Sequence, residues 1–218
     1  MSDPEATALP EIIPIFPLTG VLLLPRGRLP LNIFEPRYLA MTRDAMAGER
    51  LIGMVQPSDP PIREMNPAVY PLGCAGRITS FAETDDGRFL ITLTGVSRFS
   101  IKDELPLVSG YRRIVAAWGA FAADGAPDEA EFDRARLIRG LRHFFSQRQV
   151  EADWGAIEQA PGEHLVTSIA MMCPFAPSEK QALLEAKDVA ERARLLIALI
   201  EMTAVAPPPA QPGPATRH

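Results

Sequence analysis

The chain has 218 residues, of which 47% are hydrophobic and 22% are charged, and its formal net charge is −5. A chain of this length buries roughly 70% of its unfolded surface, so it forms a core without disulfides or metals. It is too short for an ATPase fused to a protease, and its acidic balance argues against a general affinity for nucleic-acid phosphates.

Prolines divide the chain into three parts. Of the 22 prolines, thirteen precede residue 107 and five fall in the last twelve residues. Because proline fixes φ and lacks a backbone N–H, it marks turns and strand ends in a folded region. We therefore expect a turn-rich front part, a helical middle part and a disordered, proline-rich tail at 206–218.

The two cysteines and the N-terminal segment indicate the compartment. Cys74 and Cys173 form no CxxC pair, so buried, reduced thiols are expected rather than a disulfide or a metal site. The N-terminus lacks the features of a secretory signal, and no apolar run reaches the ~18 residues of a membrane span. We expect a cytoplasmic protein without a membrane partner.

The front part is rich in short strand patterns. Four prolines interrupt the apolar segment 12–34, which excludes a long helix and favours three short strands. Pro36 suits a first helical position and predicts a short helix near 36–47. Residues 51–55 predict another strand, followed by a surface loop over the proline-rich segment 56–67.

The clearest local pattern is a β-hairpin. Segments 77–83 and 88–93 flank an Asp85-Asp86-Gly87 turn, and apolar residues alternate along the second segment. The two aspartates could be taken for a cation site, but a turn is the far stronger interpretation.

Further strands are expected after a bend at Gly95, near 98–104 and at 111–118. Seven or eight short strands with one helix indicate a closed or nearly closed β-barrel over 10–118.

The rest of the chain has helical patterns. Small and turn-forming residues at 119–130 predict a connector, and 131–205 predicts a helical bundle. One helix is expected at 129–148 and a second from Pro161 to Met172. Residues that resemble capping boxes predict two more helix starts, at Ser178 and Asp188. The fold class is therefore α+β.

Several motifs, taken in order, resemble the N-terminal domain of Lon proteases. They are FPL at 16–18, VLLLPRG at 21–27, LPLNIFEPRY at 29–38, GCAGRI at 73–78, DGR at 86–88, LTGVSRF at 93–99 and SEKQALLE at 178–185 with Arg192. The resemblance covers about residues 10–203. It implies a PUA-like β-barrel followed by a helical bundle, and a domain that recognises protein substrates while separate domains bind ATP and cut peptide bonds.

Catalytic motifs of such machines are missing from the sequence. In a Walker A motif a lysine directly follows a glycine, and none of Lys102, Lys180 and Lys187 follows a glycine. A Ser-Lys protease dyad needs a desolvated lysine, whereas these three lie in polar sequence contexts that predict exposure. We expect no enzyme activity and no cofactor.

The resembling motifs also supply candidate peptide-binding residues. Charges beside apolar strands favour buried or half-buried ion pairs. The functional interpretation is a polar rim around an apolar groove that holds unfolded or hydrophobic segments of other proteins. It implies an adaptor in protein quality control that works alone or with a separate protease or chaperone. The candidate residues are Leu23, Pro25 and Tyr38 for the groove and Glu35, Arg37, Arg77 and Arg98 for its polar rim.

An RNA- or small-ligand-binding PUA-like domain is the alternative. A basic helix face of Arg136, Arg139, Arg142 and His143 could contact RNA, but acidic residues lie just upstream and a solvated face is the simpler interpretation. Nucleic acid is therefore an unlikely partner.

Two further possibilities have weaker support. His164 and Ser168, spaced i, i+4 beside Glu163, could form a hydrolytic site, but no GxSxG motif is present. A metal would have to recruit His143, His164 and both cysteines from distant segments, so no metal site is expected.

The last helix carries a wide apolar arc that either fills the bundle or forms a homodimer interface. Its residues are Val189, Leu195, Leu196, Leu199, Ile200 and Met202.

Overall fold

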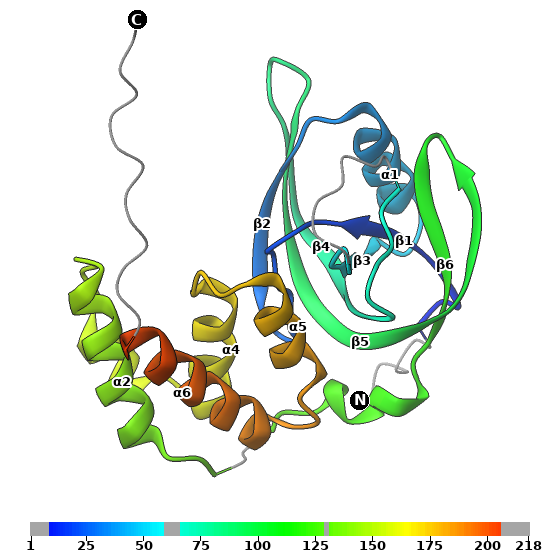
Figure 1. The fold of residues 1–218 in the computed structure, drawn as a ribbon. Helices are drawn as coiled ribbons and strands as arrows, with labels where there is room; N and C mark the ends of the chain where they lie inside the picture. Colours follow the sequence, from blue (N-terminus) through cyan, green and yellow to red (C-terminus); the bar gives the residue numbers. More distant parts are fainter. Residues whose placement is uncertain (1–8, 59–65, 129–130, 206–218) are drawn as a thin grey trace, which may run out of the picture.

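The computed structural model describes residues 9–58, 66–128 and 131–205, and it has an α+β fold with one mixed sheet and several helices (Figure 1). The predicted tail at 206–218 and part of the predicted loop at 56–67 lie outside these residues. The sheet part comprises β1 (Ile12–Pro17), β2 (Arg28–Ile33), α1 (Pro36–Ala47), β3 (Leu51–Val55), β4 (Leu72–Glu83), β5 (Phe89–Val108) and β6 (Tyr111–Ala117).

The helical part follows the sheet in the chain and lies beside it (Figure 1). It comprises the 3₁₀ segment η1 (Gly119–Gly125) and the helices α2 (Arg134–Gln147), α3 (Trp154–Gln159), α4 (Gly162–Met172), α5 (Pro177–Glu185) and α6 (Val189–Val205). Helix α6 packs against α2, α4 and α5.

The strand pairings of the sheet close into a ring. The order is β2-β5-β4-β3-β1-β6, and β6 pairs again with β5. The β1–β3 pair is parallel and every other pair is antiparallel. The first half of β5 pairs with β2 and β4, whereas its second half pairs with β6, so β2 lies outside the ring. Because its other edge has no strand partner among the described residues, β2 is an outer strand.

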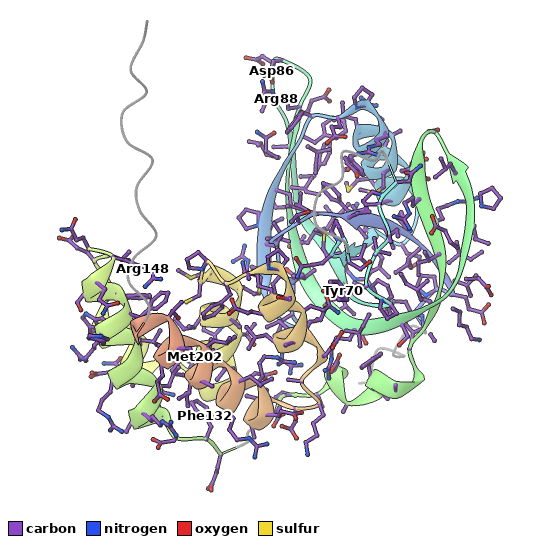
Figure 2. All side chains as sticks on the ribbon, in the orientation of Figure 1. Tyr70, Asp86, Arg88, Phe132, Arg148 and Met202 are labelled. Atoms are coloured by element: carbon purple, nitrogen blue, oxygen red, sulfur yellow. The ribbon has the colours of Figure 1, made fainter. Side chains whose placement is uncertain are left out.

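Several local predictions are confirmed. Helix α1 begins at Pro36, where the missing N–H of proline costs no hydrogen bond. The Asp-Gly turn joins β4 to β5 with Gly87 at φ 77°. Asp86 forms a 2.8 Å ion pair with Arg88 at the tip of this hairpin, which confirms the turn interpretation of the aspartates (Figure 2).

The prediction of seven or eight strands is wrong, since the described residues contain six. Segment 12–34 holds two strands instead of three, because the apolar run Leu22–Leu24 is buried on all sides and pairs with no strand. The strand expected near 98–104 is part of one long strand, β5.

Gly95 permits a close backbone approach instead of a bend. A Cβ at this position would lie 1.9 Å from the carbonyl oxygen of Leu24. The Arg26 N–H donates to the Gly95 carbonyl (2.8 Å), and the Gly95 N–H donates to the Gly27 carbonyl (2.8 Å). The irregularity is confined to a register shift opposite Ala75 and Gly76, so β5 continues through it.

The helix predictions are partly confirmed. Helix α4 follows Pro161 as expected, and Asp188 caps α6 by accepting from the Glu191 N–H (2.7 Å). The helix predicted to start at Ser178 is present as α5 and begins one residue earlier, at Pro177, where proline suits the first position. Helix α3 was not predicted, since six residues are too few to show a helical period.

Two apolar clusters hold the molecule together. The smaller one fills the strand ring and includes Ile15, Phe99 and Ile114, each fully buried. The larger one runs from Leu24 and Leu93 in the sheet part to Leu137 and Leu196 in the helices. The two parts therefore share a core. Within the described residues, no helix is long and apolar enough to cross a bilayer.

Candidate functional site

The seven candidate binding residues do not form one groove. Leu23 is 2% exposed and belongs to the core, and Pro25 is also buried. Leu23 therefore does not line an open groove, whereas Pro25 lines a small hollow of about 80 Å³ that Arg98 also lines. Arg77 lies apart from the others, where its Nη1 donates to the Glu49 carbonyl (2.7 Å).

Three of the candidates line a surface hollow of about 170 Å³ between the end of β1 and the β2–α1 junction. We call it the Tyr38 hollow. Its walls are Phe16, Pro17, Leu18, Leu31, Asn32, Ile33, Phe34, Glu35, Arg37 and Tyr38.

Aromatic stacking and an ion pair shape the Tyr38 hollow. The Phe16 and Tyr38 ring centroids are 4.1 Å apart, and the Arg37 guanidinium lies 4.5 Å from the Tyr38 centroid. Arg37 also pairs with Glu35 (3.0 Å), and burial raises the pKa of Tyr38. Phe34 is 62% exposed at the rim, so the hollow offers apolar surface to a ligand.

Arg98 occupies a different place, at the junction between the sheet and the helices. It is 5% exposed, and its Nη2 lies 2.7 Å from Oδ1 of Asp124, which is 8% exposed. Its guanidinium also donates to three carbonyls near the end of α5, those of Leu184 (3.2 Å), Ala186 and Lys187 (3.2 Å). One side chain thus joins β5, η1 and the segment before α6, which agrees with the buried ion pair favoured for charges beside apolar strands.

Other charged groups complete this junction, which we call the Arg98 cluster. Arg26 donates to the Asp124 carbonyl (2.9 Å) and forms an ion pair with Glu163 of α4. Arg192 donates to the Leu183 carbonyl (2.9 Å), and burial together with nearby Arg98 lowers the pKa of Arg192. Every one of these charges has a partner, so the cluster is a structural junction.

Sequence analysis missed Asp124, the partner of Arg98. It lies in η1, within the segment 119–130 expected to be a simple connector. An isolated acid among alanines and glycines was the only signal in the sequence, and nothing local relates it to an arginine 26 residues earlier.

Lys180 was predicted to be exposed, but the structure buries it. It is 6% exposed, and its Nζ donates to the Gly20 carbonyl (2.8 Å), which ties α5 to the sheet part. Burial lowers the pKa of Lys180, but its hydrogen bonds go to backbone carbonyls and not to a serine.

The residues proposed for other chemistry do not assemble a site. Glu163 is engaged by Arg26, and His164 is exposed without a recorded bond to Ser168. Both cysteines are buried, and burial raises the pKa of Cys173 to about 11. Within the described residues, no group of three or more His, Cys, Asp or Glu residues could hold a metal.

The basic face of α2 is largely neutralised within the chain. Arg136 pairs with Glu201 (2.7 Å), and Arg142 pairs with Glu158 (2.7 Å) and lies 4.5 Å from the Trp154 ring centroid. The apolar arc of α6 is mostly used in the core, and Met202 at its end is 68% exposed (Figure 2).

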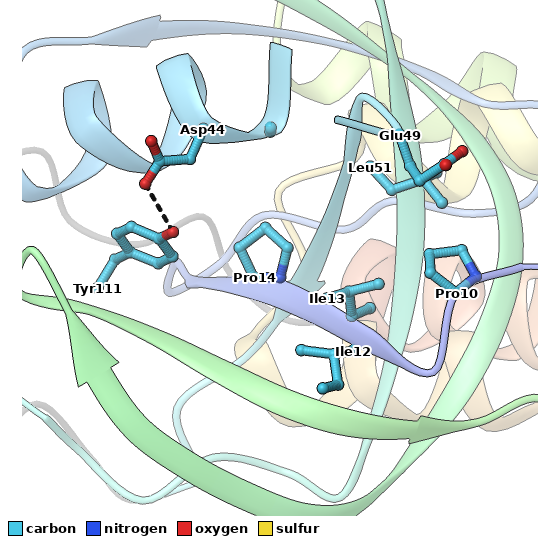
Figure 3. Close-up of a pocket in the computed structure, with 9 residues that line it drawn as sticks. Pro10, Ile12, Ile13, Pro14, Asp44, Glu49, Leu51 and Tyr111 are labelled. Atoms are coloured by element: carbon cyan, nitrogen blue, oxygen red, sulfur yellow. Dashed lines mark hydrogen bonds between the residues drawn. The ribbon is translucent and has the colours of Figure 1, made fainter. Parts of the chain in front are cut away.

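A second surface hollow, also of about 170 Å³, lies at the other end of α1. We call it the Asp44 hollow. Figure 3 shows Pro10, Ile12, Ile13 and Pro14 of the β1 segment on one side and Asp44, Glu49 and Leu51 on the other. The Tyr111 hydroxyl donates to Asp44 Oδ2 (2.8 Å) and closes one end of the hollow.

Comparison with known proteins assigns a family. The profile described as the ATP-dependent protease La (LON) substrate-binding domain matches residues 12–202. Lon protease 2 of Sorangium cellulosum is 27% identical over 212 residues, which cover 91% of this chain and 26% of that protein. Lon protease 2 of Myxococcus xanthus is 24% identical over 201 residues, covering 88% of this chain and 24% of that protein. The chain thus spans about a quarter of the length of these relatives.

Solved structures agree in fold. A Lon N-terminal domain protein from Xanthomonas campestris matches with a TM-score of 0.59 at 23% identity, covering 86% of this chain and 97% of that chain. The N-terminal domain of Lon protease from the Mycobacterium avium complex matches with a TM-score of 0.62 at 17% identity, covering 87% and 98%. Together with the profile match over nearly all the described residues, these similarities mean that the chain belongs to the Lon substrate-binding domain family.

Proposed function

We propose that this protein binds unfolded or hydrophobic segments of other proteins at the Tyr38 hollow and has no catalytic activity of its own. The observation that carries the proposal is an apolar hollow with Phe34 exposed at its rim, in a chain of a substrate-binding family. Exposed apolar surface of this kind is a marker of protein-interaction sites.

Side-chain capture fits the site better than addition of a strand. The outer strand β2 has one edge without a strand partner in the described part of the chain, but Pro30 lies in its middle and cannot donate a backbone hydrogen bond. An apolar side chain could instead enter the hollow and pack against Leu31 and the stacked rings of Phe16 and Tyr38, while the rest of the segment stays outside. Such a pocket tolerates many sequences, as a recognition module for unfolded proteins must.

The finer architecture belongs to the same proposal. We propose that the strand ring is a PUA-like barrel spanning 10–118, that 119–130 connects it to a helical bundle at 131–205, and that both act as one unit because they share a core. The adaptor role, a separate protease or chaperone partner, homodimer formation and a cytoplasmic location are part of the proposal. RNA is not favoured as a ligand, because the acids pairing with Arg136 and Arg142 reduce the positive charge of α2.

The test is binding of fluorescein-labelled peptides that contain phenylalanine and leucine, followed by fluorescence anisotropy. We expect Phe34→Ser to weaken binding by about tenfold, as for loss of a central aromatic contact. The matched control is Leu107→Ser, because Leu107 is 49% exposed on β5, outside the Tyr38 hollow. If the Phe34→Ser variant and the natural protein bind with equal affinity, the Tyr38 hollow is not the binding site. If the natural protein binds none of the peptides, the proposed function itself is contradicted.

A further inference from the structure

We propose that the Asp44 hollow accepts a lysine or arginine side chain of the bound protein segment, so that the module prefers segments in which basic residues accompany apolar ones. This inference rests on the proposed function and specifies the class of segment. It concerns a site separate from the Tyr38 hollow, at the opposite end of α1.

The two sides of the Asp44 hollow differ in chemistry (Figure 3). The β1 side presents the apolar surfaces of Pro10, Ile12 and Pro14, and Ile12 is 51% exposed. The α1–β3 side presents two carboxylates, that of Asp44 at the end beside Tyr111 and that of Glu49 at the end beside Pro10. Lysine and arginine match this arrangement because their aliphatic stems pack on apolar surface while the charged head stays at the polar edge.

Among the described residues, the carboxylates of the hollow have no cationic partner. No ion pair to Asp44 or Glu49 occurs among the residues that the structure describes. Of the nearby arginines, Arg43 lies over the Phe89 ring, and Arg77 donates to the backbone carbonyl of Glu49. Arg113 is close enough to Tyr111 to affect its pKa but does not line the hollow. The hollow is therefore complementary to a positive charge.

Tyr111 holds one of these carboxylates in place. Its hydroxyl donates to Asp44 Oδ2 (2.8 Å), and burial together with this hydrogen bond raises the pKa of Tyr111 to about 12. The hydroxyl therefore remains a donor, and the other lone pairs of the carboxylate remain available to an incoming ammonium or guanidinium group.

The size of the hollow selects a single side chain. At about 170 Å³ it is smaller than the roughly 300–1,000 Å³ of pockets that bury whole small-molecule ligands. One lysine or arginine side chain, presented by a longer segment, is the occupant that its volume and its charge both fit.

The experiment uses two sets of labelled peptides containing phenylalanine and leucine, identical except that lysine in one set is glutamine in the other. The position of the lysine is varied along the peptide. We expect the best lysine peptide to bind the natural protein about two- to fivefold more tightly than its glutamine counterpart, as for an ion pair with exposed carboxylates. Added salt should reduce this preference.

The diagnostic variant is Asp44→Asn with Glu49→Gln. Asparagine retains an oxygen that accepts from Tyr111, and Glu49 is exposed, so the fold should be kept. We expect the lysine preference to disappear while affinity for the glutamine peptides is unchanged. The control is Glu131→Gln with Glu151→Gln, two exposed residues of the helical part, which makes the same change in net charge and should keep the preference.

The outcomes separate the two proposals. If the natural protein binds both peptide sets equally, or if the Asp44/Glu49 variant keeps the lysine preference, the Asp44 hollow is not the site of a basic side chain and the proposed function stands. If neither set binds the natural protein at all, the proposed function itself fails.

Discussion

The Arg98 cluster and the Asp44 hollow both gather charged side chains, but they differ in how those charges are paired. In the cluster, the Arg98 guanidinium donates to Asp124 and to three backbone carbonyls, and it is almost completely buried. In the hollow, Asp44 and Glu49 are exposed, and Tyr111 is the one recorded side-chain partner of either carboxylate within the described residues.

This difference separates a structural role from a binding role. A buried charge whose hydrogen-bonding groups are all paired has nothing left to offer a ligand, and removing it leaves its partners unpaired in the interior. An exposed carboxylate loses little when it is neutralised, but it can still attract a cation. Substitutions in the cluster should therefore change stability, and substitutions in the hollow should change binding.

The largest effect is expected for Arg98→Met. This change leaves Asp124 buried without its cation and leaves the carbonyls of Leu184, Ala186 and Lys187 without their donor. The free energy of unfolding, measured by urea denaturation, should fall by about 3–5 kcal/mol.

Arg136→Met is the matched control, because Arg136 also forms a 2.7 Å ion pair but is exposed. Its cost should stay below about 1 kcal/mol. Similar losses for the two variants would contradict the structural role of the Arg98 cluster.

Gly95→Ala should have the next largest effect. The new Cβ would collide with the Leu24 carbonyl and displace the segment whose Arg26 reaches the Arg98 cluster. Loss of two backbone hydrogen bonds and local overpacking should cost about 2–3 kcal/mol, again measured with urea. Gly119→Ala is the control, because a Cβ there would have no atom within 4 Å. If both substitutions lower the free energy of unfolding equally, the close approach of the Leu24 carbonyl is not the reason for glycine at position 95.

Alkaline pH should produce a smaller loss. Burial raises the pKa of Cys173 to about 11, so the folded state holds its thiol proton more tightly than the unfolded state, where the pKa is about 8.5. The resulting stabilisation is fully present below about pH 8.5 and is lost as pH rises toward 11. At pH 10 the part of the loss due to Cys173 should be about 1–2 kcal/mol. Burial also raises the pKa of Cys74, so that thiol adds a loss of its own in the same pH range.

The measurement is urea denaturation at pH 7 and pH 10 for the natural protein and for Cys173→Ala. The variant starts from a lower stability because a buried side chain is shortened, but its loss between the two pH values should be smaller. An equal loss in both proteins would show that another group, such as Cys74 or Tyr111, controls the alkaline transition.

Local signals in the sequence predicted the elements that depend on neighbouring residues. Pro36 marked the start of α1, the Asp-Gly turn marked the β4–β5 hairpin, and Asp188 marked the start of α6. In each case the physical cause lies within a few residues of the feature, so a single sequence contains it. The family resemblance was carried by longer motifs and is confirmed by the profile match.

Features that depend on distant residues could not be read in the same way. Most acceptors around Arg98 are backbone carbonyls, which every residue possesses, so the sequence does not mark them. Leu23 was a candidate because it lies in one of the resembling motifs, and its burial could not be recognised because a residue buried on all sides leaves no alternating pattern. The Asp44 hollow combines residues near position 12, near position 47 and at Tyr111, which only the sheet pairing brings together.

The smallest effect on stability is expected for Asp44→Asn with Glu49→Gln, the substitution that should remove the preference for basic segments. Both residues are exposed, and neither has a recorded ion pair within the described part of the chain, so urea denaturation should show a change below about 0.5 kcal/mol. Unchanged stability together with a lost lysine preference would show that Asp44 and Glu49 serve binding, whereas Arg98 stabilises the fold. A loss of several kcal/mol would instead mean that these carboxylates stabilise the fold as Arg98 does, and the distinction between a paired cluster and an open hollow would fail.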